Sequence, residues 1–182
     1  MMIPKILLLI VIYTITLHVE GCGQFKVARL GNTIYEGVFT GNGLLGTMTY
    51  LSGKKSVRID IGRTDVYDHR ANSEDKLFDK ARLSLGYFNL DLPGTIAQAE
   101  GTMHLKEACA VATIATAQGQ IKVKTTTLSN ANIILLEVLK KDFKGMYKLN
   151  WVADSAISPR MKFSYTQKPG NYLPNPAGIN GK

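Results

Sequence analysis

Cysteine, histidine and tryptophan are scarce in this chain, which excludes several kinds of functional site. Two cysteines do not make a disulfide framework, and neither His69 nor His104 has a second His or Cys at the spacing of a metal site. The sequence also contains no nucleophile elbow and no phosphate-binding loop. We therefore expect neither a metal nor another cofactor. Cys109 stands among small and apolar residues, which predicts a buried thiol, with a bridge to Cys22 as the alternative.

No apolar run reaches the roughly 20 residues that a membrane-spanning helix needs. The run at residues 6–17 is shorter, follows a lysine, and precedes small residues. This order is typical of a secretory signal peptide, which we expect over residues 1–21. A buried N-terminal helix or strand is the alternative.

The end of this segment, Val19-Glu20-Gly21-Cys22, resembles the lipobox of bacterial lipoproteins, in which the cysteine is acylated. Glu20 departs from that pattern, because its position usually holds a small residue. The alternative is ordinary cleavage near Gly21 or Gly23. Under both alternatives the mature chain is extracytoplasmic, either secreted or periplasmic, and Cys22 is the lipidation candidate.

Basic residues outnumber acidic ones, 22 to 14, and the formal net charge is +8. A basic surface can attract anionic glycans, nucleic acid or membrane headgroups. The lysines are scattered, however, and no nucleic-acid-binding motif accompanies them. We therefore interpret the charge as a solvated outer face. We expect no nucleic acid as partner, and membrane contact only through a lipid on Cys22.

Alternation of apolar and polar residues with a period of two dominates the chain from Gly41 to Trp151. The hydrophobic content of 45% and the 17 glycines are those of a globular protein. Short alternating segments separated by turn residues predict an all-β fold, either a twisted antiparallel β-sandwich or a barrel. One segment, the apolar run 133–139, reads as a strand covered on both faces. The expected strands are 46–50, 57–61, 83–87, 121–127, 133–139 and 147–151.

The remaining segments differ in composition. We expect residues 22–36 to form an N-terminal linker or first strand, and residues 37–157 to form the β-sandwich domain. Ser73 to Lys80 has an N-cap candidate followed by acidic residues, which predicts a short helical turn. Prolines and glycines are frequent in residues 158–182, which predicts a loop or a truncated end and leaves the sandwich incomplete.

Residues 62–70 combine two arginines, two aspartates, a tyrosine and a histidine directly after an expected strand. This mixture suits a sugar site, because charged groups bind vicinal hydroxyls and an aromatic ring packs on the apolar face of a sugar. The alternative is that Arg63 and Arg70 pair with the two aspartates and hold a strand-end loop in place. The candidate ligand-binding residues are Arg63, Asp65, Asp68 and His69.

Four stretches between residues 37 and 160 form an ordered set of motifs: Gly41-Asn42-Gly43-Leu44-Leu45-Gly46, Gly62 to Arg70, Arg82 to Phe88, and Trp151 to Arg160. The first stretch predicts a tight turn, since its glycines suit a positive φ. In this order the four stretches resemble the N-terminal β-domain of glycoside hydrolase family 95, the α-L-fucosidases, and more closely a related group of unassigned function.

This resemblance implies a supersandwich-like β-domain that packs against a helical barrel, with the catalytic acid and base on the barrel. No position of this chain corresponds to the barrel, so no catalytic residue is carried over and a missing C-terminal barrel is an implied partner. The expected function is the non-catalytic N-terminal portion of a secreted glycoside hydrolase-like protein that acts on glycans. The alternatives are a stand-alone carbohydrate-binding module, for which Trp151 and scattered tyrosines would form the aromatic platform, and a small structural lipoprotein.

Overall fold

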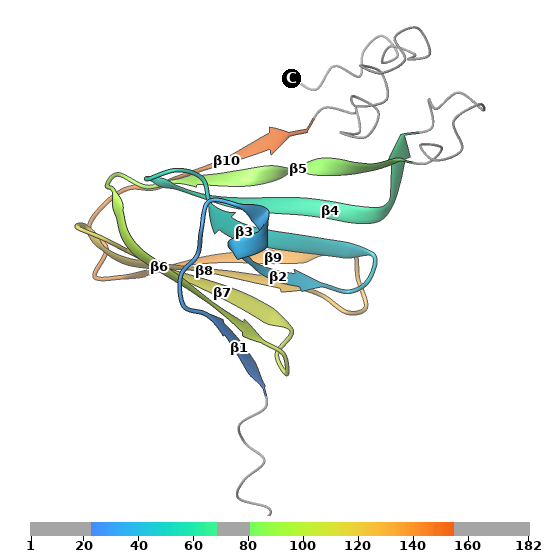
Figure 1. Ribbon diagram of the computed structural model, residues 1–182, viewed down its shortest axis with the longest axis horizontal. Coiled ribbons are helices and arrows are strands. Elements are labelled where there is room, and N and C mark those ends of the chain that lie inside the picture. The colour runs from blue at the N-terminus through green and yellow to red at the C-terminus, as the bar shows by residue number, and fades with distance from the viewer. Residues whose placement is uncertain (1–22, 69–80, 155–182) are drawn as a thin grey trace, which may run out of the picture.

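Residues 23–68 and 81–154 are described by a computed structural model, and they fold into two antiparallel sheets that face each other (Figure 1). Each sheet has five strands, and within these two ranges the one helical element is the short 3-10 helix η1 (Ile34–Glu36). The expected all-β sandwich is therefore confirmed. No helix in the same ranges is long and apolar enough to cross a membrane.

The first sheet, called sheet A, has the strand order β1-β6-β7-β8-β9. Strands β6 to β9 follow one another as consecutive hairpins, which is the pattern that short alternating segments with turn signals predict. β1 pairs with β6, so the stretch 22–36 contributes a first strand to the sandwich. The bounds in sheet A are β1 (Gln24–Val27), β6 (Ile96–His104), β7 (Cys109–Thr116), β8 (Gly119–Thr127) and β9 (Ile134–Lys141).

The second sheet, called sheet B, has the strand order β10-β5-β4-β3-β2. The predicted hairpin of residues 46–50 and 57–61 is confirmed, since β3 and β4 pair antiparallel with Thr49 opposite Ile59. The bounds in sheet B are β2 (Val38–Gly41), β3 (Leu45–Leu51), β4 (Ser56–Asp68), β5 (Ala81–Asp91) and β10 (Lys148–Ala153).

The core lies between the two sheets and is built from alternate residues of the strands. On β4, for example, Val57, Ile59 and Ile61 are buried, whereas Arg58 and Asp60 lie on the opposite, outer face. The sheets contact each other mainly where β2 and β3 lie against β6, β7 and β8. The largest fully buried side chains include Leu30, Leu90, Ile114, Ile121 and Val123.

Two strands differ from the expectation. β4 continues to Asp68, so most of the motif region is strand and not a strand-end loop, although its pairing with β5 shifts register after Ile61 and again after Gly62. The prediction that residues 133–139 are covered on both faces is wrong, because one face of β9 is open to solvent, with Leu135 46% and Leu139 52% exposed; β9 is also an edge strand. An apolar run does not reveal which strand is central, because strand order is set by tertiary pairing. The helical turn predicted at 73–80 lies outside the described residues.

Candidate functional site

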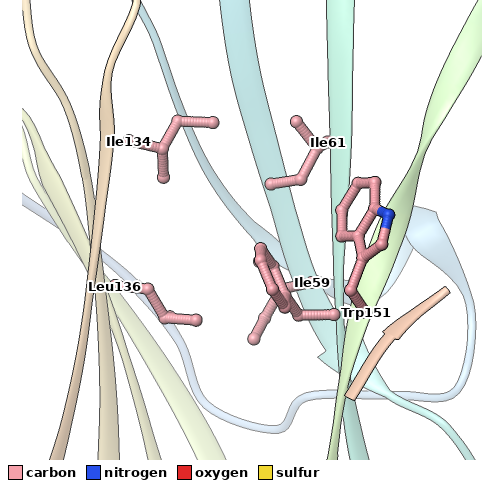
Figure 2. A pocket seen from close by; sticks show the side chains of 6 residues that line it. Ile59, Ile61, Ile134, Leu136 and Trp151 are labelled. Atoms are coloured by element: carbon pink, nitrogen blue, oxygen red, sulfur yellow. The ribbon is translucent and has the colours of Figure 1, made fainter. Parts of the chain in front are cut away.

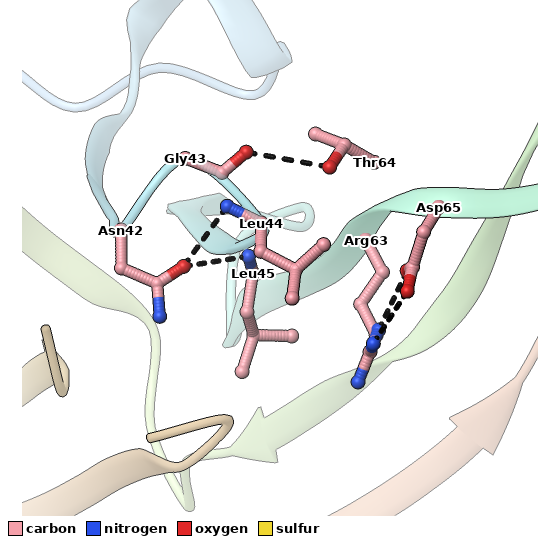
Figure 3. Close-up of polar contacts among 7 residues, drawn as sticks. All are labelled: Asn42, Gly43, Leu44, Leu45, Arg63, Thr64 and Asp65. Carbon is pink, nitrogen blue, oxygen red and sulfur yellow. Dashed lines mark hydrogen bonds and ion pairs between the residues drawn. The ribbon is translucent and has the colours of Figure 1, made fainter. Parts of the chain in front are cut away.

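Arg63 and Asp65, two of the predicted sugar-binding residues, lie on β4 and bind each other (Figure 3). Arg63 Nε lies 2.8 Å from Asp65 Oδ1, and Arg63 Nη2 lies 2.7 Å from Asp65 Oδ2, which makes a bidentate ion pair. The hydrogen bonds of this pair raise the pKa of Arg63 and lower the pKa of Asp65. An ion pair within the motif is what the alternative interpretation predicts, in which the arginines pair with the aspartates. Because the two charged groups bind each other, neither needs a ligand.

The structure brings together two of the four predicted contact residues. Asp68 is the last residue of β4, where its backbone is in register with Ala81 of β5. The Asp68 side chain, His69 and the lipidation candidate Cys22 lie outside the described residues.

Asn42 organises the turn between β2 and β3 (Figure 3). Its Oδ1 accepts hydrogen bonds from the backbone N–H groups of Leu44, at 3.0 Å, and Leu45, at 2.8 Å. Its Nδ2 donates to the backbone carbonyl of Leu128 at 2.9 Å, which ties the turn to sheet A. Gly43 has a φ of +88°, so the predicted positive φ in this turn is confirmed.

A row without side chains crosses the outer face of sheet B next to this turn. Gly41 of β2 is in register with Gly46 of β3, which is in register with Gly62 of β4, and Gly62 is in register with Ser84 of β5. The three glycines span two interstrand spacings, a length of about 10 Å, and Ser84 continues the row on β5. A Cβ atom on Gly62 would meet nothing within 4 Å, so a ligand can approach the backbone closely there.

Side chains beside this row turn it into a groove of about 700 Å³, called the glycine groove. Apolar side chains lie at its β2 end, and polar side chains lie at its β5 end. Ligand sites commonly have volumes of roughly 300–1,000 Å³, so the groove is large enough for a small oligosaccharide. Its lining includes Ile34, Phe39 and Met48 at the β2 end, Arg58, Asp60 and Arg63 from β4, and Arg82 and Ser84 from β5.

Arg58 and Asp60, which form one wall of the glycine groove, belong to a network with two tyrosines behind them. Arg58 Nε lies 2.7 Å from Asp60 Oδ1, and the Tyr50 hydroxyl donates to Asp60 Oδ2 at 2.8 Å. The Arg58 guanidinium lies over the ring of Tyr87, 3.6 Å from its centroid, which is the geometry of a cation–π contact. Both oxygens of Asp60 are therefore occupied, and the wall is held rigidly.

The environment of this network shifts two pKa values. Burial, together with the hydrogen bond to Asp60, raises the pKa of Tyr50 to about 12. Burial by itself would lower the pKa of Arg58, but the hydrogen bond and charge of Asp60 outweigh it and the pKa is raised. At neutral pH Tyr50 is thus a neutral donor and Arg58 a cation.

A second polar group on the same outer face surrounds Asp91 of β5. Asp91 Oδ1 accepts hydrogen bonds from Ser56 Oγ at 2.6 Å and Asn89 Nδ2 at 2.7 Å, and Asp91 Oδ2 accepts one from Asn150 Nδ2 at 3.3 Å. Four strands of sheet B thus carry hydrogen-bonding or aromatic side chains on their outer face. A sheet face that only contacts solvent needs no such ordered network. The outer face of sheet B is therefore a stronger candidate for a ligand surface than the Arg63–Asp65 pair alone.

A separate apolar cleft of about 360 Å³ opens between the two sheets (Figure 2). Ile59, Ile61 and Phe88 line it from sheet B, together with Trp151 of β10, whose ring centroid lies 4.9 Å from that of Phe88. Trp151 is in register with Phe88 and lies on the inner face of its sheet, away from the glycine groove. The single tryptophan therefore provides no platform for a ligand on the outer face.

Sequence reasoning missed the glycine groove and its wall. Arg58 and Asp60 are visible only as the polar positions of an alternating strand, a pattern that every half-buried strand shares. The alignment of Gly41, Gly46 and Gly62 depends on the register of three strands, which the sequence alone does not reveal.

The described part of the chain has no group of three or more His, Cys, Asp or Glu side chains that could hold a metal ion. Cys109 is a buried free thiol, as the prediction of a buried cysteine requires, and burial raises its pKa. A buried thiol with a raised pKa is a poor nucleophile.

Comparison of the chain with models of known protein families and with curated proteins finds no match.

Proposed function

We propose that this chain is the non-catalytic, glycan-binding β-sandwich portion of a secreted glycoside hydrolase-like protein. Glycans bind in the glycine groove of sheet B, and the bond-cleaving residues belong to a C-terminal helical barrel outside this chain. The protein is secreted or periplasmic, with Cys22 as the site of a lipid anchor where one is added.

The observation that carries this proposal is the groove itself. Its floor of glycines admits a flat ring, and its lining includes Arg82 and Ser84 of β5, which carry hydrogen-bonding groups. Phe39 is 56% exposed at one end, where the apolar face of a sugar ring can pack on it. Sugar recognition needs this combination of hydrogen-bonding groups and an aromatic face.

The described part of the groove is suited to binding. Hydrolysis of a glycosidic bond needs an acid that can donate a proton and a second carboxylate on the other side of the bond. Among the described residues that line the groove, the carboxylates are Asp60 and Asp154. Asp60 accepts hydrogen bonds from Arg58 and Tyr50, so it is committed to holding the wall.

The test is a glycan array probed with the 182-residue chain, with affinities of the positive sugars measured by titration calorimetry. Replacing Phe39 by Ala removes the aromatic face and is expected to lower the affinity about tenfold. Phe25→Ala on β1 is a matched control, because Phe25 is also 56% exposed and does not line the groove. Absence of binding to every glycan, or an equal effect of the two variants, would contradict the proposal.

One observation also favours the stand-alone carbohydrate-binding module. The described lining of the glycine groove forms a continuous surface on sheet B, as the binding site of a module would. If the isolated chain and a longer product of the same reading frame bind a glycan equally well, the module interpretation is preferred. A large gain of affinity in the longer product would favour a site shared with the barrel.

A further inference from the structure

We propose that the ligand of the glycine groove is an acidic glycan, and that Arg82 holds its carboxylate or sulfate group. This inference rests on the proposed function, because it assumes that glycans bind in that groove. It adds the chemical class of the ligand and the residue that selects it.

Three arginines line the groove within the described part of the chain, and two of them already have partners. Arg58 forms an ion pair with Asp60 at 2.7 Å and stacks on Tyr87. Arg63 forms its bidentate pair with Asp65. The charge of each of these two guanidinium groups is thus already balanced by a carboxylate of this chain.

Arg82 differs from these two. It precedes Ser84 by two positions on β5, so it shares the outer face of the strand with the end of the glycine row. Its side chain is exposed and lines the groove, and it makes no ion pair with any residue of the ranges 23–68 and 81–154. Among the described residues that line the groove, Arg82 is therefore the cation without a carboxylate partner.

The acidic residues of the groove do not cancel this charge. Asp60 is paired with Arg58, and Asp154, which follows β10, forms no ion pair with Arg82. The chain as a whole carries a net charge of +8, which attracts anionic polymers and speeds their association. The electrostatics of the groove and of the whole chain thus favour the same kind of ligand.

The chemistry of Arg82 matches such a ligand. The planar guanidinium presents parallel N–H donors that fit a carboxylate or sulfate in a bidentate manner. Phe39 lies at the other end of the groove, so the ligand is expected to combine a stacked sugar ring with an anionic group across the row of glycines.

The test uses uronic-acid oligosaccharides as free carboxylates and as their methyl esters, sulfated oligosaccharides with their desulfated counterparts, and neutral oligosaccharides. The wild-type chain, Arg82→Gln and Arg29→Gln are compared by calorimetry. Arg29 is exposed, does not line the groove, and its replacement changes the net charge by the same amount.

For the wild-type chain, we expect esterification or desulfation to lower the affinity by about tenfold to a hundredfold, the usual range for a charge-assisted hydrogen bond. Arg82→Gln should abolish that difference, and Arg29→Gln should preserve it. Equal binding of the charged and neutralised sugars, or an unchanged preference in Arg82→Gln, would overturn the inference and leave the proposed function standing. Failure of the wild-type chain to bind any oligosaccharide would instead overturn the proposed function.

Discussion

Replacing Gly62 by valine is expected to stabilise the protein and to weaken glycan binding at the same time. Gly62 lies in the middle of β4 and forms part of the floor of the glycine groove. A glycine within a strand costs about 0.5–1 kcal/mol relative to alanine, and a β-branched residue suits a strand better still. The new Cβ meets nothing within 4 Å, so its own placement carries no steric penalty that would offset this gain.

The size of the stability change follows from the length of the chain. For a protein of 150–250 residues, 1 kcal/mol shifts the melting temperature by about 2–4 °C, so Gly62→Val should raise it by about 1–4 °C. The isopropyl group would also occupy the floor where a ligand approaches the backbone. We expect a loss of glycan affinity of about tenfold or more, which corresponds to 1.4 kcal/mol.

Differential scanning calorimetry and glycan titration measure the two effects on the same samples. Gly94→Val is the matched control, because Gly94 also has room for a Cβ, with its nearest neighbours 3.8 Å away, and does not line the groove. A stable Gly62→Val variant that binds glycan as tightly as the wild type would refute the assignment of the groove. A melting temperature several degrees lower would refute the stability argument.

Three further outcomes are expected from unfolding measurements in urea. The folded-state pKa of Tyr50 is raised to about 12, so its contribution to the free energy of unfolding is complete below about pH 10 and is lost between about pH 10 and 12. The free energy of unfolding should fall by on the order of 2–3 kcal/mol over this range, and Tyr50→Phe should not show this fall. Leu90→Ala, at a fully buried position, should lower the free energy of unfolding by about 2–5 kcal/mol, whereas Leu135→Ala, at a position 46% exposed, should lower it by less than about 1 kcal/mol. Similar losses in the two variants would contradict the assignment of Leu90 to the core. Asn42→Ala should cost about 2 kcal/mol through its lost turn hydrogen bonds, and Asn42→Asp should keep the part that depends on Oδ1.

Much of the fold could be predicted because strand periodicity is a local property. The alternation of Val57, Ile59 and Ile61 with Arg58 and Asp60 shows a half-buried strand without knowledge of its neighbours. The same logic located the β3–β4 hairpin, since turn residues and alternation lie next to each other in the chain. It failed for β9, because an apolar run carries no information about its place in the sheet.

The candidate site could be predicted only in part. Arg63 and Asp65 could be selected from the sequence because charges of opposite sign lie close together there. The same closeness lets the two side chains pair with each other. The groove beside them includes residues without a functional side chain, above all Gly41, Gly46 and Gly62, which a search of the sequence for reactive groups passes over. Glycine is common in turns and strands alike, so only its alignment across neighbouring strands gives it a role in a site.

The amino-acid sequence by itself determined the all-β class, the inward and outward faces of individual strands, and the positive charge of the chain. These properties follow from side-chain identity and from spacing along one segment. The tertiary structure decided the order and register of the strands, and with them the row of glycines, the pairing of Arg58 with Tyr87 and the exposure of Arg82. Register depends on contacts between residues far apart in the chain, and for this reason the glycine groove exists only in the folded protein.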